Sequence, residues 1–87
     1  MYYTESIYYK INGMWDLIGE SSEMATYIVD CCFNYPYEII YNNKKMTRKQ
    51  VVNGYLYKAV NNAERVVIRK YLDRQTKEVV EVDVEIY

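Results

Sequence analysis

The clearest pattern in the chain is a stripe of apolar side chains at helical spacing within residues 46–62. The stripe consists of Val51, Val52, Tyr55, Leu56, Ala59 and Val60. Apolar residues three or four apart fall on one face of a helix, so this segment is predicted to be one amphipathic helix. Thr47 and Gln50 have the spacing of a capping box, which places the helix start at Thr47. Gly54 falls on the outer face, where it is expected to cost about 1 kcal/mol relative to alanine.

A second pattern alternates every two residues, which predicts strands with one buried face. It is cleanest in residues 78–87. There the side chains expected to face inward are Val80, Val82, Val84 and Ile86, and those expected to face outward are Glu81, Asp83 and Glu85. Residues 64–72 are predicted to form the strand that pairs with it, across a polar turn. The expected pairs are Val66 with Val84, Ile68 with Val82, Arg65 with Glu85 and Arg69 with Glu81.

Residues 2–20 are predicted to form a β-hairpin, because Asn12-Gly13 between alternating runs is a strong signal for a type I′ turn. One face of this hairpin is the better core candidate, and it carries Ile7, Tyr9, Ile11, Met14 and Ile18. The other face is expected to be a satellite core or a binding surface, and it carries Tyr8, Lys10, Trp15 and Leu17.

Residues 22–34 are predicted to form the first helix, with Ser21 or Ser22 as its N-cap and with Pro36 enforcing its end. Its polar side consists only of Thr26, Asp30 and Asn34. A helix this apolar is usually covered on more than one side, by the rest of the domain or by a second chain. Val29 and Phe33 share one flank, and they are the expected interface pair.

The remaining elements complete an α+β fold in a single domain that spans residues 1–87. Residues 37–46 are predicted to form a short hairpin with Asn42-Asn43 at its turn. The order of elements is then ββα-ββα-ββ. We expect an antiparallel or mixed sheet with both helices on one face and the other face largely in solvent.

Composition excludes several classes of protein. The chain is 51% apolar and 26% charged, which is ordinary for a globular domain. No apolar run approaches the roughly 20 residues of a membrane span, and the first ten residues do not resemble a signal peptide. We therefore expect a cytoplasmic protein that does not enter membranes. Cys31 and Cys32 are adjacent, and both are expected to be free thiols.

The side chains that most enzymes require are missing or scattered. The chain has no histidine, which is the commonest general base and metal ligand. Its three glycines are isolated from one another, so there is no glycine-rich phosphate loop. The carboxylates of the last strand are better explained by ion pairs with arginines than by catalysis. We expect no enzyme activity, no catalytic residue, no metal site and no cofactor.

Charge is distributed unevenly along the chain. Residues 44–74 hold nine Lys or Arg and two acids, whereas the rest of the chain holds two Lys and ten acids. A cluster of four cations lies at the start of the helix at residues 46–62, and it consists of Lys44, Lys45, Arg48 and Lys49. This cluster predicts either an anion or nucleic-acid site or a solvated, lysine-rich turn.

Two functional classes remain. The first is a non-enzymatic protein-binding module, favoured by small size and by twelve tyrosines, which are frequent in interfaces. Its expected partner-binding residues are Val29, Phe33, Tyr57, Glu78, Glu81, Asp83 and Glu85. One version is a phage or mobile-element inhibitor of a host defence protein, anti-CRISPR-like or anti-restriction-like, that occupies a basic nucleic-acid site. A homodimer is the other protein contact left open.

The second class is a nucleic-acid-binding module that uses the Lys44–Lys49 cluster together with tyrosines that stack on bases. The slightly acidic overall charge and the acidic last strand place it behind the first class. Tyrosine richness has a second explanation, because A/T-rich codons encode tyrosine, asparagine, lysine and isoleucine.

Overall fold

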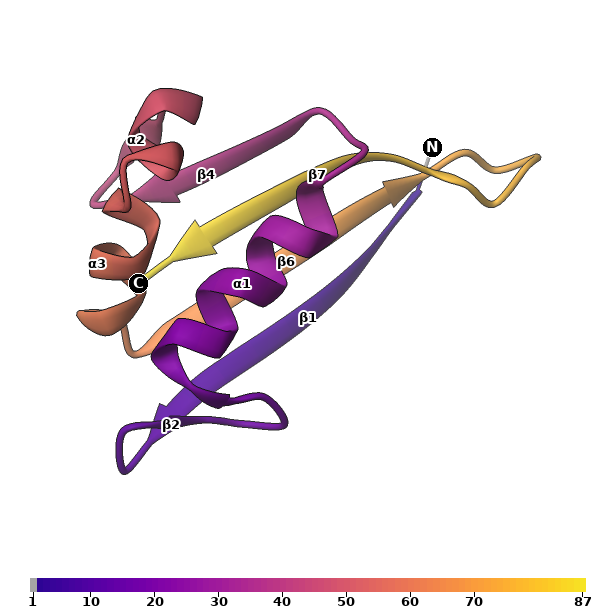
Figure 1. The fold of residues 1–87 in the computed structure, drawn as a ribbon. Helices are drawn as coiled ribbons and strands as arrows, with labels where there is room; N and C mark the ends of the chain where they lie inside the picture. Colours follow the sequence, from indigo (N-terminus) through magenta and orange to yellow (C-terminus); the bar gives the residue numbers. More distant parts are fainter. Residues whose placement is uncertain (1) are drawn as a thin grey trace.

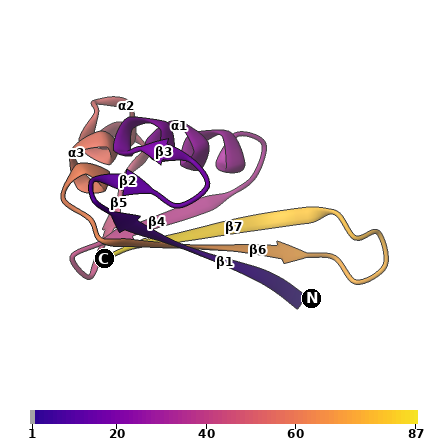
Figure 2. The same cartoon turned by 90° about the horizontal axis from the view of Figure 1, so that it is seen from below.

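The computed structural model describes residues 2–87 and shows a seven-stranded mixed sheet with three helices on one of its faces (Figures 1 and 2). The α+β class predicted from the sequence is confirmed. The strands are β1 (Tyr2–Ile11), β2 (Met14–Trp15), β3 (Gly19–Glu20), β4 (Tyr37–Tyr41), β5 (Lys44–Met46), β6 (Arg65–Leu72) and β7 (Val79–Ile86). The helices are α1 (Ser21–Cys32), α2 (Arg48–Val52) and α3 (Tyr55–Asn61).

The strands lie in the order β3-β2-β1-β6-β7-β4-β5. All neighbours pair antiparallel except β4 and β7, which run parallel. The last strand in the sequence therefore lies inside the sheet, between β6 and β4. None of the helices in residues 2–87 combines the length and apolar character that a membrane span requires.

One apolar core fills the space between the helices and the sheet. Its largest fully buried side chains are Met24, Ile28, Cys32, Ile39, Leu56, Val60, Val66, Val82 and Val84. Strand β7 shows how the two-residue period builds this core, because Val82, Val84 and Ile86 point to the helices while the acids between them point away. This alternation confirms the outward direction predicted for Glu81, Asp83 and Glu85.

The helix predicted for residues 46–62 is two helices, so that prediction is wrong. The capping box is present, since the Gln50 amide donates to the Thr47 hydroxyl at 3.2 Å and the Thr47 amide donates to the Gln50 side chain at 2.9 Å. The break comes at Gly54, whose φ of 88° is a left-handed conformation that glycine adopts without strain. It turns the chain so that Val52 stays 84% exposed, whereas Leu56 is buried.

The first hairpin presents the opposite face to the core from the one predicted. Trp15 is buried and Tyr8 packs against the core, whereas the predicted core residues Ile7, Tyr9, Ile11 and Met14 are exposed. Ile18 is half-buried and packs against the core as predicted, and Leu17 of the other predicted face is 91% exposed. Both faces of β1 carry apolar side chains, so the alternation identifies the strand but not its buried side. The serine cap predicted for α1 is also wrong, because its N-cap is Glu20, which makes no side-chain capping bond.

The predicted register between β6 and β7 is wrong by two residues. Val66 pairs with Ile86 and Ile68 pairs with Val84. A shift of two residues keeps every side chain on its predicted face. An irregularity beside Leu72 accompanies the shift, and it leaves Val80 exposed instead of inward while Val79 packs on the core.

Candidate functional site

No other residue in the described part of the chain covers the face of the sheet opposite to the helices (Figure 2). We call it the open face. It consists of the outward side chains of β1, β6, β7 and β4 together with Lys45 and Tyr87. Its large exposed apolar or aromatic side chains are Tyr3, Ile7, Tyr9, Ile11 and Tyr87. Val67 lies among them and is only 5% exposed, because Ile7 and Glu85 flank it on the neighbouring strands.

Arg69 holds the centre of the open face through two ion pairs. Its Nε donates to Glu5 on β1 at 2.7 Å, and its Nη1 donates to Glu85 on β7. Glu85 also accepts a hydrogen bond from the Tyr87 hydroxyl. These contacts, with the Tyr87 hydroxyl first and Arg69 second, hold the pKa of Glu85 below its usual value. The three strands are therefore linked by polar side chains as well as by their backbones.

Acidic groups outnumber basic ones on the open face. The acids are Glu5, Glu38, Glu81, Asp83 and Glu85, and the bases are Lys45, Arg65 and Arg69. Within residues 2–87, Arg69 pairs with Glu5 and Glu85, and Lys45 pairs with Glu38 at 2.6 Å. The carboxylates of Glu81 and Asp83 have no ion-pair partner among these residues. A cation supplied by another molecule would meet them without displacing an existing pair.

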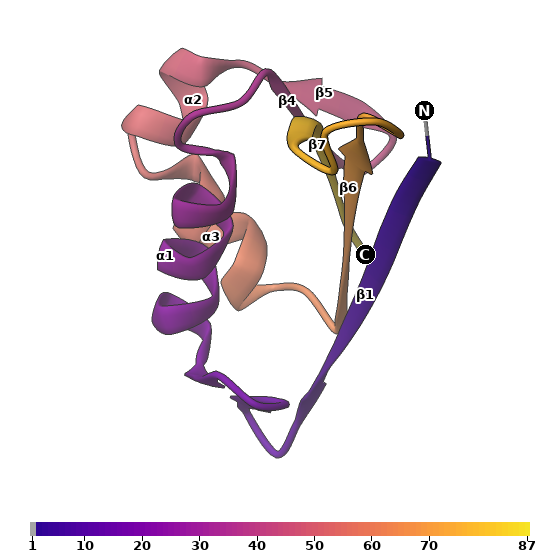
Figure 3. The ribbon, with the colours of Figure 1, turned by 90° about the vertical axis from the view of Figure 1, so that its right-hand side faces the viewer.

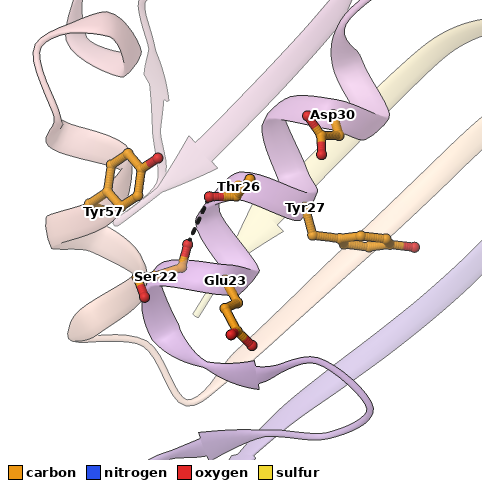
Figure 4. A pocket seen from close by; sticks show the side chains of 6 residues that line it. All are labelled: Ser22, Glu23, Thr26, Tyr27, Asp30 and Tyr57. Atoms are coloured by element: carbon orange, nitrogen blue, oxygen red, sulfur yellow. Dashed lines mark hydrogen bonds between the residues drawn. The ribbon is translucent and has the colours of Figure 1, made fainter.

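The helix layer carries a second set of the predicted partner-binding residues. Val29 lies on α1, and Phe33 is the C-cap residue that directly follows this helix and is 78% exposed. Tyr57 lies on α3, across a shallow hollow of about 300 Å³ from the outer side of α1 (Figure 4). Tyr27 leaves α1 in another direction, and its hydroxyl lies 3.1 Å from that of Tyr8 on β1.

The seven predicted partner-binding residues are therefore not brought together on one surface. Glu81, Asp83 and Glu85 lie on the open face, whereas Val29, Phe33 and Tyr57 lie on the helix layer behind it, and Glu78 lies in the turn between β6 and β7. An interface at Val29 and Phe33 stays a prediction, as does self-association through α1.

The predicted cluster of four cations is divided between β5 and α2. Lys45 is engaged by Glu38 on the open face, whereas Arg48 stacks over the ring of Tyr37 at 4.3 Å on the helix side. Lys44 and Lys45 both border a hollow of about 360 Å³ that is also lined by Tyr41, Gln50 and Tyr55. The capping box occupies the amides of Thr47 and Gln50 at the start of α2. Anion or nucleic-acid binding by this cluster stays a prediction.

The sequence did not reveal the part of the open face that β1 contributes. Tyr3, Glu5, Ile7 and Tyr9 reach this face because β1 pairs with β6 more than fifty residues later in the chain. The signal that could have found them is the apolar character of both faces of β1. A strand with two apolar faces needs cover on both sides or has an exposed apolar surface.

Two observations concern metal binding and thiol chemistry in residues 2–87. No group of three or more Cys, Asp or Glu residues within residues 2–87 could hold a metal ion. Burial raises the pKa of the Cys32 thiol to about 12, which keeps it protonated near neutral pH. Comparison with protein-family models, with curated proteins and with solved structures found no significant match to this chain.

Proposed function

We propose that this chain is a non-enzymatic protein-binding module that docks its open face onto a basic surface of a partner protein. The observation that carries the proposal is the open face itself, where exposed Tyr3, Ile7 and Tyr9 lie beside an excess of carboxylates. Apolar and aromatic surface supplies contact area, and tyrosine supplies it with few rotatable bonds. A sheet whose strands are linked by the Arg69 ion pairs needs little reordering when it binds.

The charge of the open face favours a protein partner over a nucleic acid. Phosphates bind through lysine and arginine, but both arginines of this face are engaged, Arg69 by two carboxylates and Arg65 by the Tyr87 ring at 4.1 Å. The unpaired carboxylates of Glu81 and Asp83 would repel a phosphate backbone. The same two carboxylates complement a lysine- or arginine-rich protein surface.

A basic surface of this kind is what a nucleic-acid-binding protein presents to its substrate. Carboxylates on a small rigid sheet can take the positions of phosphates and pair with the same arginines. The specific form of the proposal is therefore an inhibitor that occupies the nucleic-acid site of a host defence protein, as a phage or mobile element would use.

The test is a pull-down from nuclease-treated bacterial lysate with three tagged proteins. They are the wild type, the open-face variant Glu81→Lys/Asp83→Lys, and a control variant Glu23→Lys/Asp30→Lys. The control has the same change in net charge but carries it on α1, behind the sheet. The proposal expects one stoichiometric protein that survives nuclease treatment, is retained by the control and is lost from the open-face variant.

Three results would overturn the proposal. The first is that no protein binds in stoichiometric amount. The second is that the open-face variant retains the partner as well as the wild type does. The third is that only nucleic acid is recovered and that nuclease removes everything, which would favour the nucleic-acid class and the cluster at Lys44 to Lys49.

A further inference from the structure

Strand β1 leaves most of one edge of the sheet unpaired. One side of β1 pairs with β6 from Tyr2 to Tyr9, but on the other side β2 pairs only with Lys10 and Ile11. The β2–β3 hairpin then turns away from the sheet, toward the start of α1 (Figure 3). Within residues 2–87 no strand pairs with the outer side of Tyr2 to Tyr8.

The hydrogen bonds at the end of β1 show which backbone groups are free. The Lys10 amide donates to the Glu64 carbonyl on the β6 side at 2.9 Å, whereas the Tyr9 carbonyl accepts from the Asp16 amide on the outer side at 3.1 Å. Backbone groups of successive residues point to opposite edges of a strand. The amide and carbonyl groups of Tyr3, Glu5 and Ile7 therefore point outward.

The two ends of the sheet differ in how they are protected against pairing. Edge strand β5 is only three residues long, and two of these residues are Lys44 and Lys45. A short length and exposed lysines are two common features that prevent another strand from pairing with an edge. The free part of β1 has seven residues, no proline and no lysine. Its one charged side chain is Glu5, whose carboxylate forms an ion pair with Arg69. Tyrosine, threonine and isoleucine in this segment all favour strands.

Three symmetric registers would pair β1 with a second copy of itself in antiparallel orientation. A twofold axis at Ser6 places Tyr3 of the copy opposite Tyr9. The Tyr9 carbonyl already accepts a hydrogen bond from the Asp16 amide, so this register is blocked at that end. An axis at Glu5 sets Glu5 opposite Glu5 of the copy, and like charges opposite one another are destabilising. An axis at Thr4 avoids both problems, while an axis closer to the N-terminus shortens the paired segment.

The register with its axis at Thr4 is also complementary in hydrogen bonding. It sets the Glu5 carboxylate beside the Tyr3 phenol of the copy, on the open face, and it does so twice. The same residues exchange backbone hydrogen bonds, because Tyr3 and Glu5 point their amides and carbonyls outward. Thr4 lies opposite Thr4 of the copy, which is a favourable pair across antiparallel strands.

We infer that two copies of this chain associate by antiparallel pairing of β1 with β1, over Tyr2 to Ser6 and with the twofold axis at Thr4. The pairing joins two seven-stranded sheets and makes one continuous open face from two. A single strand pair buries less than about 1,000 Å², so the association depends strongly on protein concentration.

Disulfide trapping distinguishes this register from the others. Thr4 and Ser6 are both exposed, lie on the same strand and face the same side. With the axis at Thr4, the two Thr4 Cα atoms lie about 4.5 Å apart, within disulfide range, whereas the two Ser6 Cα atoms lie more than about 10 Å apart. In a Cys31→Ser background, Thr4→Cys is expected to form a disulfide dimer on mild oxidation about tenfold faster than Ser6→Cys.

A second measurement uses no new cysteine. Sedimentation of the wild-type chain is expected to show its mass rising from 10.5 kDa toward twice that value as concentration increases. Tyr3→Pro removes an outward amide that no other described residue uses, so it should stay folded by circular dichroism but remain a monomer. Tyr3→Ala keeps the amide and should retain measurable dimer.

Each contrary result overturns the inference. Faster trapping of Ser6→Cys would set the axis at Ser6, and equal rates for the two cysteine variants would indicate an axis at Glu5 or random collision. A wild-type mass that stays at one chain up to about 1 mM, well above the range expected for a small interface, would show that the edge remains unpaired. A dimer that persists in folded Tyr3→Pro would place the contact elsewhere, with α1 as the next candidate.

Discussion

At the scale of single residues, the two adjacent cysteines have different surroundings. Cys32 is buried on the side of α1 that faces the core, whereas Cys31 is half-buried on a flank of the same helix. Desolvation disfavours the thiolate of Cys32, and the thiolate is the form that reacts. Adjacent positions on a helix point about 100° apart, so one sequence position decides which thiol is shielded.

This difference predicts the reactivity of the two thiols. With a thiol-reactive dye at pH 8, Cys31 is expected to react within minutes, whereas Cys32 reacts only at the rate at which the domain unfolds. Absorbance should therefore show one equivalent of thiol in buffer and two in denaturant. Equal and rapid reaction of both thiols in buffer would contradict the packing of α1 on the sheet.

A second residue-scale prediction concerns acid stability at Glu85. Its pKa is lowered in the folded state, so its stabilising contribution is fully present above the unfolded value of about 4.3. That contribution is lost as pH falls through the lower, folded pKa. Glu85→Gln should therefore lose less of its free energy of unfolding between pH 6 and pH 3 than the wild type, as measured by urea denaturation.

The matched control is Glu78→Gln, which changes an exposed carboxylate in the turn between β6 and β7. This control should lose the same free energy of unfolding as the wild type over the pH range. If Glu85→Gln and the control behave alike, the hydrogen bond from Tyr87 and the ion pair with Arg69 do not stabilise the Glu85 carboxylate in the folded state.

At the scale of elements, residues 46–62 show where a periodic pattern is insufficient. The apolar stripe runs through Gly54 without interruption, so the pattern predicts one helix. The break depends on the left-handed backbone of Gly54, which has no signature in hydrophobic spacing. The start of α2 was predictable, because the capping box is local in sequence and the structure contains it.

The two views of Gly54 predict opposite signs for Gly54→Ala. Inside a continuous helix, alanine would stabilise by about 1 kcal/mol. At a φ of 88°, the alanine Cβ clashes with the backbone, so we expect a loss of about 1 kcal/mol in the free energy of unfolding. Urea denaturation measures the sign directly. No atom of a residue elsewhere in the fold lies within 4 Å of an added Cβ, so the strain comes from the local backbone alone.

The strands divide in the same way into what local sequence decides and what it does not. Alternation found β6 and β7 and correctly turned Glu81, Asp83 and Glu85 outward. It could not choose between registers two residues apart, since valines and acids recur at the same spacing in each. The open face was only half predictable, because Tyr3 and Ile7 join it through pairing with β6, and that contact is not encoded by any local period.

At the scale of the whole molecule, stability is expected to be graded from the middle of the sheet to its ends. Strands β6 and β7 are paired on both sides and covered by helices, whereas β2 and β3 pair over two residues each. Segments with few buried contacts open locally, while central strands open only when the whole domain unfolds.

Hydrogen exchange should report this gradient. Amides of Val66, Ile68, Val82 and Val84 are expected to exchange only by global unfolding, with protection equal to the free energy of unfolding from urea. Amides of β2 and β3 should exchange much faster, through local opening. Equal protection in β2 and β7 by nuclear magnetic resonance would show that the hairpin is part of the same cooperative unit.

The position of β7 between β6 and β4 also constrains how the chain can fold during translation. Until β7 leaves the ribosome, β4 and β5 have no strand that connects them to β1 and β6. The nascent chain therefore holds two incomplete half-sheets with exposed valines and isoleucines, and chaperones bind such surfaces. The sheet closes only when β7 is inserted, so this domain is expected to fold only after β7 has left the ribosome.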